Sequence, residues 1–142
     1  MSQQEQSTHH ADVEALDRVR EAHIAALNDG DVNAWVAAFT ADGVQMPPNA
    51  PANLGRESIR TWSQGFLALF RAAFALVVDE VQVAGNWAFE RGAYTITLTP
   101  KAGGEPMQDI GKYITIYERQ PSDAWGMARD TWNSNNPPFI PR

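Results

Sequence analysis

Apolar residues in the first part of the chain recur at the spacing of a helix. From Ala11 to Leu27 they fall three or four residues apart, which predicts an amphipathic helix. The segment Asn28–Asp31 ends this helix, and Asp31 can cap a second one. The apolar residues of that second helix are Trp35, Val36 and Phe39. After Gly55 a third helix is predicted, because its apolar residues again lie on one stripe: Ile59, Trp62, Phe66, Leu69 and Phe70.

From Phe74 onward the pattern changes to alternation and to runs of β-branched and aromatic residues, which are typical of strands. The predicted strands are Phe74–Val83, Trp87–Thr99, Met107–Arg119 and Trp125–Asn133. The short turns between them force neighbouring strands to be antiparallel.

A shorter strand is predicted at Val44–Met46, after a turn at Thr40–Gly43. The prolines of Pro47–Leu54 then predict a loop without regular structure. This order of elements predicts an α+β fold, with two to three helices packed on the concave face of a strongly curved antiparallel β-sheet around an apolar pocket.

The composition fits one domain. The chain has 142 residues, of which 44% are hydrophobic, and it has no cysteine. We expect a disordered lead over residues 1–10, the α+β domain over residues 11–136 and a Pro-rich tail over residues 137–142. The lead has no apolar core of a secretory signal, and no apolar run is long enough to cross a bilayer. A cysteine-free chain suits a reducing compartment, so a cytoplasmic location without membrane contact is expected.

Charge and motifs narrow the function classes. The formal net charge is −6, and no Lys/Arg cluster offsets it, so a nucleic-acid partner is not expected. There is no Ser-His-Asp order, no glycine loop that would cradle a phosphate and no spaced His/Glu set for a metal. The sequence therefore predicts neither a cofactor nor a metal.

Four segments carry a family resemblance, namely Ala26–Asp31, Phe39–Val44, Gly111–Tyr113 and Asp130–Asn135. With the order of elements, they resemble the nuclear-transport-factor-2-like superfamily, in its SnoaL-like and ketosteroid-isomerase-like branch of poorly characterised domains. The resemblance implies a cone-shaped fold. The superfamily includes ketosteroid isomerases, polyketide cyclases of the SnoaL type and scytalone dehydratase, so it does not imply one reaction.

This chain lacks the catalytic residues of the ketosteroid isomerases at the matching positions. The isomerases have a proton-shuttling Asp just before a Pro in the first strand, and here Met46 precedes Pro47. They also have a Tyr in the first helix, which this chain lacks there. Steroid isomerisation by that route is therefore not expected.

Strand parity predicts which polar residues reach the pocket, because alternate side chains face opposite sides of a sheet. By the resemblance, Trp132 faces the cavity and Asp130 does so with it. The pair Ile114 and Ile116 suggests that they point inward together with Lys112.

In the strand Trp87–Thr99, the resemblance favours Glu90 and Tyr94 inward. The opposite parity, with Trp87, Phe89 and Arg91 inward, stays open, since both sets mix aromatic and charged residues.

The resulting candidate site has two parts. The candidate catalytic residues are Asp130, Tyr94, Lys112 and Glu90, and the candidate ligand-binding residues are Met46, Trp62, Ile114, Ile116 and Trp132. Two neighbouring carboxylates in an apolar cup can act as general acid or base near neutrality, with Tyr94 or Lys112 stabilising an oxyanion. The alternatives are ligand orientation without chemistry, or an ion pair of Lys112 with Asp130 or Glu90 that only organises the sheet.

Three functions fit these residues. The chain is a cofactor-free isomerase, cyclase or dehydratase acting on a small hydrophobic carbonyl compound, a binding module without turnover, or a dimerising interaction domain. A homodimer through the outer sheet face is expected, because the residues predicted to lie outward would form a large aromatic patch on a monomer. That patch consists of Trp87, Phe89, Tyr113, Thr115 and Tyr117.

Overall fold

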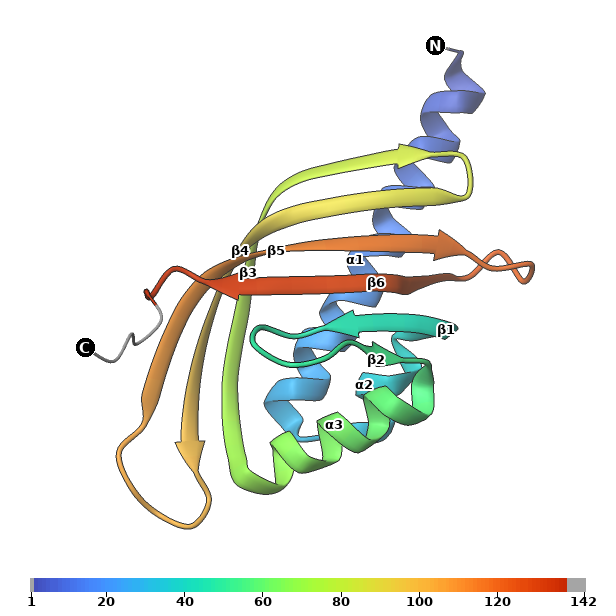
Figure 1. Cartoon of the computed structure of the whole chain (residues 1–142). Helices are drawn as coiled ribbons and strands as arrows, with labels where there is room; N and C mark the ends of the chain where they lie inside the picture. The colour runs from blue at the N-terminus through green and yellow to red at the C-terminus, as the bar shows by residue number, and fades with distance from the viewer. Residues whose placement is uncertain (1, 138–142) are drawn as a thin grey trace.

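The computed structural model describes residues 2–137 of the chain. The helices are α1 (Gln3–Asp29), α2 (Val32–Ala37) and α3 (Arg56–Leu69). The strands are β1 (Phe39–Met46), β2 (Asn53–Leu54), β3 (Phe70–Ala84), β4 (Trp87–Pro100), β5 (Met107–Arg119) and β6 (Trp125–Ser134). They form one six-stranded sheet in the order β2-β1-β6-β5-β4-β3. The sheet bends strongly around the helices (Figure 1), so the predicted α+β class and curved sheet are confirmed.

One strand pair differs from the antiparallel prediction. Strands β3 to β6 pair antiparallel with their neighbours, as expected from their short turns. Strand β1, however, lies parallel to β6, with Gln45 opposite Asp130. Because β1 and β6 are far apart in the sequence, no hairpin turn dictates their relative direction. The prediction of an entirely antiparallel sheet is therefore wrong at this pair.

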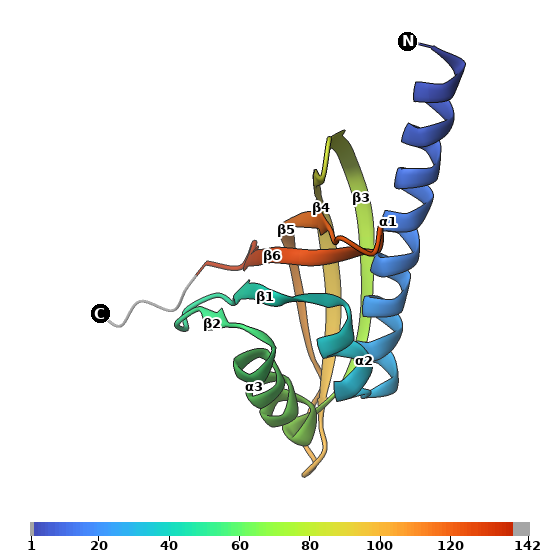
Figure 2. The same cartoon turned by 90° about the vertical axis from the view of Figure 1, so that its right-hand side faces the viewer.

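The first helix is longer than predicted. Ser2 and Glu5 form a capping box, in which the Ser2 hydroxyl accepts from the Glu5 N–H and the Glu5 carboxylate accepts from the Ser2 N–H. The good helix formers Gln and Glu then carry the helix through residues 3–10, which project beyond the sheet (Figure 2). The predicted disordered lead is wrong for these residues. The predicted tail at 137–142 lies outside the described residues except for Pro137.

The first strand is also longer than predicted. Residues 39–46 form β1, so Phe39 belongs to a strand and the predicted turn Thr40–Gly43 is extended, with a register shift between Phe39 and Val44. Asn53 and Leu54, predicted as part of an irregular loop, pair with β1 as β2. Pairing with a neighbouring strand overrides the local turn and loop signals here.

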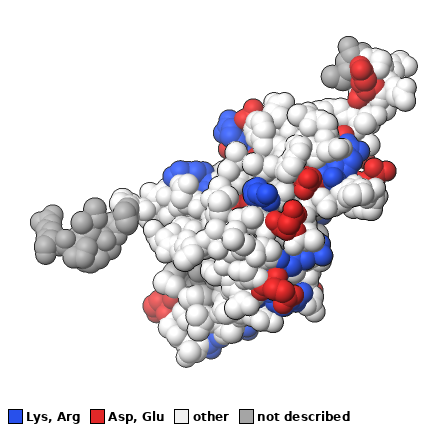
Figure 3. All heavy atoms as spheres, turned by 45° about the vertical axis from the view of Figure 1, so that its right-hand side comes forward, with Lys and Arg blue, Asp and Glu red and all other residues white. Residues whose placement is uncertain are grey.

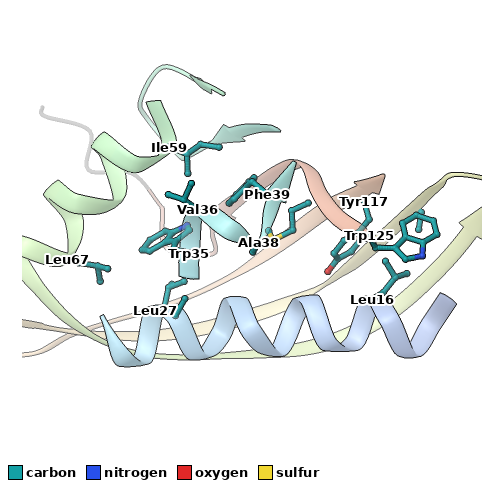
Figure 4. Close-up of a cluster of buried hydrophobic side chains, with 13 residues drawn as sticks. Leu16, Leu27, Trp35, Val36, Ala38, Phe39, Ile59, Leu67, Tyr117 and Trp125 are labelled. Atoms are coloured by element: carbon teal, nitrogen blue, oxygen red, sulfur yellow. The ribbon is translucent and has the colours of Figure 1, made fainter. Parts of the chain in front are cut away.

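The core lies between the helices and the concave face of the sheet. Figure 4 shows Trp35 and Val36 of α2 beside Ile59 of α3, with Leu16 of α1 near Tyr117 of β5. Two glycines permit close approaches within the sheet. A Cβ on Gly92 would collide with the Val77 carbonyl, and one on Gly111 would collide with the Asn133 carbonyl and the Tyr94 ring. Only glycine allows these backbone segments to approach so closely.

The outer sheet face differs from the predicted aromatic patch. Tyr113, Thr115 and Tyr117 point inward and are buried, so they cannot form an outer patch. The large apolar residues exposed on the outer face are Val77, Trp87, Ile110 and Ile114. Acidic and basic side chains are interspersed on the surface that Figure 3 shows. Within residues 2–137, no helix is both long and apolar enough to cross a membrane.

Candidate functional site

A cavity of about 230 Å³ lies between the helices and the concave face of the sheet. Its walls are mostly apolar and include Trp35, Trp62, Phe66, Phe74, Ile96 and Trp132. Trp62 stacks on Phe66 with ring centroids 5.4 Å apart, and its other neighbours Trp35 and Trp132 meet it edge-on. Such a volume with flat aromatic walls suits a small apolar ring compound.

A row of buried polar side chains crosses this apolar cavity. Cross-strand register places Glu90 of β4 opposite Thr115 of β5, Thr115 opposite Asp130 of β6, and Asp130 opposite Gln45 of β1. All four line the cavity, and none is more than 7% exposed. Buried polar groups are costly unless they are paired or used, so a row of four on one apolar wall indicates a built site.

Glu90 is held in a saturated network. The Arg20 guanidinium donates to Glu90 Oε1 from Nε at 2.9 Å and from a terminal nitrogen at 2.8 Å. Tyr113 Oη donates to Oε2 at 2.6 Å, and Tyr117 Oη donates to Oε1 at 3.2 Å.

The pKa values of the side chains that bind Glu90 are shifted by burial and by this network. Burial and then the negative charge of Glu90 raise the pKa of both tyrosines above their ordinary range. Burial alone would lower the pKa of Arg20, but its hydrogen bonds to Glu90 and Asp17 raise it above the ordinary value. Both oxygens of the Glu90 carboxylate are therefore engaged by neighbouring side chains.

Asp130 is the second buried carboxyl group of the row. It accepts a hydrogen bond from Thr115 Oγ1 to its Oδ1 at 2.8 Å, and no Lys, Arg or His of residues 2–137 forms an ion pair with it. The pKa of Asp130 is raised to about 7, chiefly by burial; the Thr115 hydrogen bond partly offsets this shift, and the charge of Glu90 adds to it. A carboxyl group that titrates near neutrality can give or take a proton at working pH.

His23 of α1 also lines the cavity. Burial lowers its pKa to about 4, so its imidazole is neutral at neutral pH. It meets Trp35, Phe39 and Phe74 edge-on, and its Nδ1 has no hydrogen-bond partner among the described residues. His23 is therefore packed among aromatic rings.

The structure brings part of the predicted site together. Glu90, Tyr94, Asp130, Trp62 and Trp132 line the cavity. Tyr94 lies four residues from Glu90 along β4, roughly 13 Å away by strand rise. Its hydroxyl donates to Asp109 at 2.8 Å, and burial and then Asp109 raise its pKa above the ordinary range. Tyr94 and Asp130 thus belong to separate polar groups.

The predicted parity of β5 is wrong. Lys112, Ile114 and Ile116 point to the outer side, and the Lys112 ammonium donates to Asn135 Oδ1 and the Ser134 carbonyl. Neither predicted ion pair of Lys112 with Asp130 or Glu90 forms. The physical reason is that the inner residues Tyr113, Thr115 and Tyr117 satisfy the buried carboxylates, so hydrogen bonding outweighs apolarity on this strand.

The first strand also places its residues differently. Met46 is 37% exposed and does not line the cavity, whereas the preceding Gln45 is fully buried in the wall. Sequence reasoning missed Gln45 and Arg20. Alternation along β1 places Gln45 on the face opposite to Val44 and Met46, and these two apolar residues made their own face look like the inner one. Nothing local marks Arg20, since its partner Glu90 lies 70 residues away.

Comparisons with known proteins agree on this architecture. The family model of the SnoaL-like domain matches residues 20–123. The chain is similar to the ketosteroid isomerase-like protein of Erwinia carotovora atroseptica, with 26% identity, a TM-score of 0.80, and coverage of 87% of this chain and 96% of that one. No curated protein matches the chain.

Two further solved structures share the fold at lower identity. An NTF2-like protein with a cystatin-like fold from Novosphingobium aromaticivorans has 17% identity and a TM-score of 0.78, with coverage of 92% and 86%. A proposed dehydratase of the NTF2-like family from Streptomyces avermitilis has 19% identity and a TM-score of 0.77, with coverage of 88% and 97%. The percentages refer to this chain first and to the relative second.

Proposed function

Because the chain belongs to the SnoaL-like domain family, we propose that it is a cofactor-free acid–base enzyme that isomerises, cyclises or dehydrates a small hydrophobic carbonyl compound. The observation that carries this proposal is Asp130, a carboxyl group buried in the wall of an apolar cavity with a pKa of about 7. Carboxyl groups with such values are concentrated at catalytic sites.

The proposed reaction uses both protonation states of the Asp130 carboxyl group. As a carboxylate, Asp130 takes a proton from the carbon next to the carbonyl group, and the C–H electron pair moves into an enolate. As a carboxylic acid, Asp130 then returns the proton to another carbon or to a departing hydroxyl group. Glu90 does not exchange protons in this scheme, because Arg20, Tyr113 and Tyr117 hold it. Burial chiefly raises the pKa of Asp130 to near neutrality, and the charge of Glu90 adds to this shift.

Native mass spectrometry of protein purified without added ligand tests this proposal. We expect a co-purified uncharged compound that contains a carbonyl group and fits about 230 Å³. Incubated with that compound, the protein should turn it over, with a rate that rises through an apparent pKa near 7 as Asp130 ionises. Tight binding without turnover at any pH would instead identify a binding module.

We also propose that the protein is a homodimer through its outer sheet face. Ile114 lies near the centre of that face, opposite Arg91 of β4 and Thr131 of β6, and a second copy would cover the exposed Val77 and Ile110. Sedimentation should give twice the chain mass of 15.7 kDa. Ile114→Lys should shift it to a monomer, whereas Ala102→Lys in the exposed β4–β5 turn should not. A monomeric wild type contradicts the proposal.

A further inference from the structure

In the polar row across the cavity wall, one hydrogen-bond donor has no partner among the described residues. Thr115 donates to Asp130 at 2.8 Å, and on the other side Asn53 Nδ2 donates to Gln45 Oε1 at 3.0 Å. Asp130 and Gln45 are direct neighbours on the parallel strands β6 and β1, yet no hydrogen bond joins them. Gln45 Nε2 is buried, and no described residue accepts a hydrogen bond from it.

We propose that Gln45 binds the carbonyl oxygen of the ligand, and that the adjacent C–H of the ligand then faces Asp130. The ligand class is an uncharged cyclic ketone with an enolisable C–H next to the carbonyl group. This inference rests on the proposed function and assigns the second polar contact of the same site.

The orientation of the Gln45 amide supports a carbonyl ligand. Asn53 occupies the oxygen end of this amide, so the NH₂ end is the one left to contact a ligand. An NH₂ group donates only, and its partner must be an acceptor such as a carbonyl oxygen. A buried donor without a partner is costly, and a ligand that supplies the acceptor is favoured for that reason.

The spacing supports an enolisable ketone. Neighbouring strands lie about 4.8 Å apart, so side chains that leave paired positions on the same face reach adjacent atoms of one small ligand. A carbonyl oxygen on Gln45 therefore brings the next carbon beside Asp130. In the reaction, the C–H bond breaks, the proton passes to the Asp130 carboxylate, and the electron pair moves into an enolate whose oxygen stays hydrogen-bonded to Gln45.

The charges around the cavity exclude a carboxylate or phosphate ligand. Glu90, Asp109 and Asp130 line the cavity, and the Arg20 guanidinium is already paired with Glu90 and Asp17. An anion brought here would meet like charges without a free cation among the described residues of the wall to compensate them. The walls and the open donor together fit a neutral ketone.

Binding of α-tetralone and of tetralin, its analogue without the carbonyl group, tests the assignment. We expect the wild type to bind α-tetralone about tenfold more tightly, the effect of one hydrogen bond to an otherwise unpaired buried donor. Infrared difference spectra should show the carbonyl stretch of bound α-tetralone shifted to lower frequency. Gln45→Met should abolish both the preference and the shift, whereas Gln108→Met on the exposed outer face should change neither.

The variants separate this inference from the proposed function. Asp130→Asn should keep the carbonyl preference but lose exchange of the α-protons of α-tetralone with deuterated solvent. If Gln45→Met keeps the preference and the shift, the assignment of Gln45 is overturned, while exchange that depends on Asp130 leaves the proposed function standing. If neither probe binds the wild type, both proposals fail.

A second variant serves if Gln45→Met does not fold. Asn53→Ala releases the Gln45 amide and is expected to weaken the preference for α-tetralone over tetralin. An unchanged preference overturns the assignment.

Discussion

Replacing Asp130 by Asn is expected to remove turnover and at the same time to stabilise the protein at pH 8. Loss of the general base should lower the rate about 10²- to 10⁴-fold. The stability gain follows from the buried carboxyl group, whose pKa rises from 3.8 to about 7 on folding because of burial and then Glu90. If Asp130 had a purely structural role, Asp130→Asn would keep turnover and lower the stability of the protein.

The direction of the stability change follows from proton binding. Between pH 3.8 and 7 the native state binds more protons at Asp130 than the unfolded state does, so the free energy of unfolding falls as the pH rises through this window. Above pH 7 the cost of the buried charge is complete. Because a tenfold change in proton affinity corresponds to about 1.4 kcal/mol, Asp130→Asn removes a cost on the order of 4 kcal/mol there and no cost below pH 3.8.

The contribution of His23 to the free energy of unfolding has the opposite dependence on pH. Its pKa falls from 6.5 to about 4 on folding because of burial, so between these values the unfolded state binds more protons and stability rises with pH. In the wild type the two trends nearly cancel between pH 4 and 6.5. Urea unfolding across this range should therefore be flat for the wild type and rise with pH for Asp130→Asn. It should fall with pH for His23→Leu. A flat profile for Asp130→Asn, or a less stable variant at pH 8, would contradict the assignment of Asp130.

The limits of sequence reasoning follow from the same residues. Helical and alternating patterns are local, so the helices and the four long strands could be predicted. The inward side of Glu90 and Asp130 was predicted from the family resemblance, because alternation alone fits either side of β4. The direction of β1 against β6 could not, because no turn connects them. The β5 prediction failed because Ile114 and Ile116 looked like core residues. Tyr113 and Tyr117 lie on the inner face of β5 instead, where they donate hydrogen bonds to Glu90 on another strand.

Arg20→Met is expected to destabilise the protein by about 3 to 5 kcal/mol, the usual effect of removing one partner of a buried ion pair. The variant would leave the Glu90 carboxylate, with a side chain only 1% exposed, without its cation. Tyr113 and Tyr117 would remain as donors but carry no charge. Urea unfolding at pH 7 measures the loss.

A matched control separates burial from the ion pair itself. Arg91 and Glu80 also lie 2.8 Å apart, but their side chains are 56% and 36% exposed. Arg91→Met should therefore change the free energy of unfolding little, since solvent screens exposed pairs. An equal loss for the two variants would show that burial does not set the value of the Arg20–Glu90 pair.

The double variant Arg20→Met with Glu90→Gln tests whether the cost arises from the unpaired charge. The amide introduced by Glu90→Gln would keep an acceptor for the tyrosines without a net charge, so we expect most of the stability lost in Arg20→Met to return. The same double variant should lower the pKa of Asp130 somewhat, because the Glu90 charge that adds to the effect of burial is gone. The window in which stability falls with pH would then move to lower pH. If the loss persists in the double variant and the window stays in place, Arg20 stabilises α1 through packing alone and Glu90 does not poise Asp130.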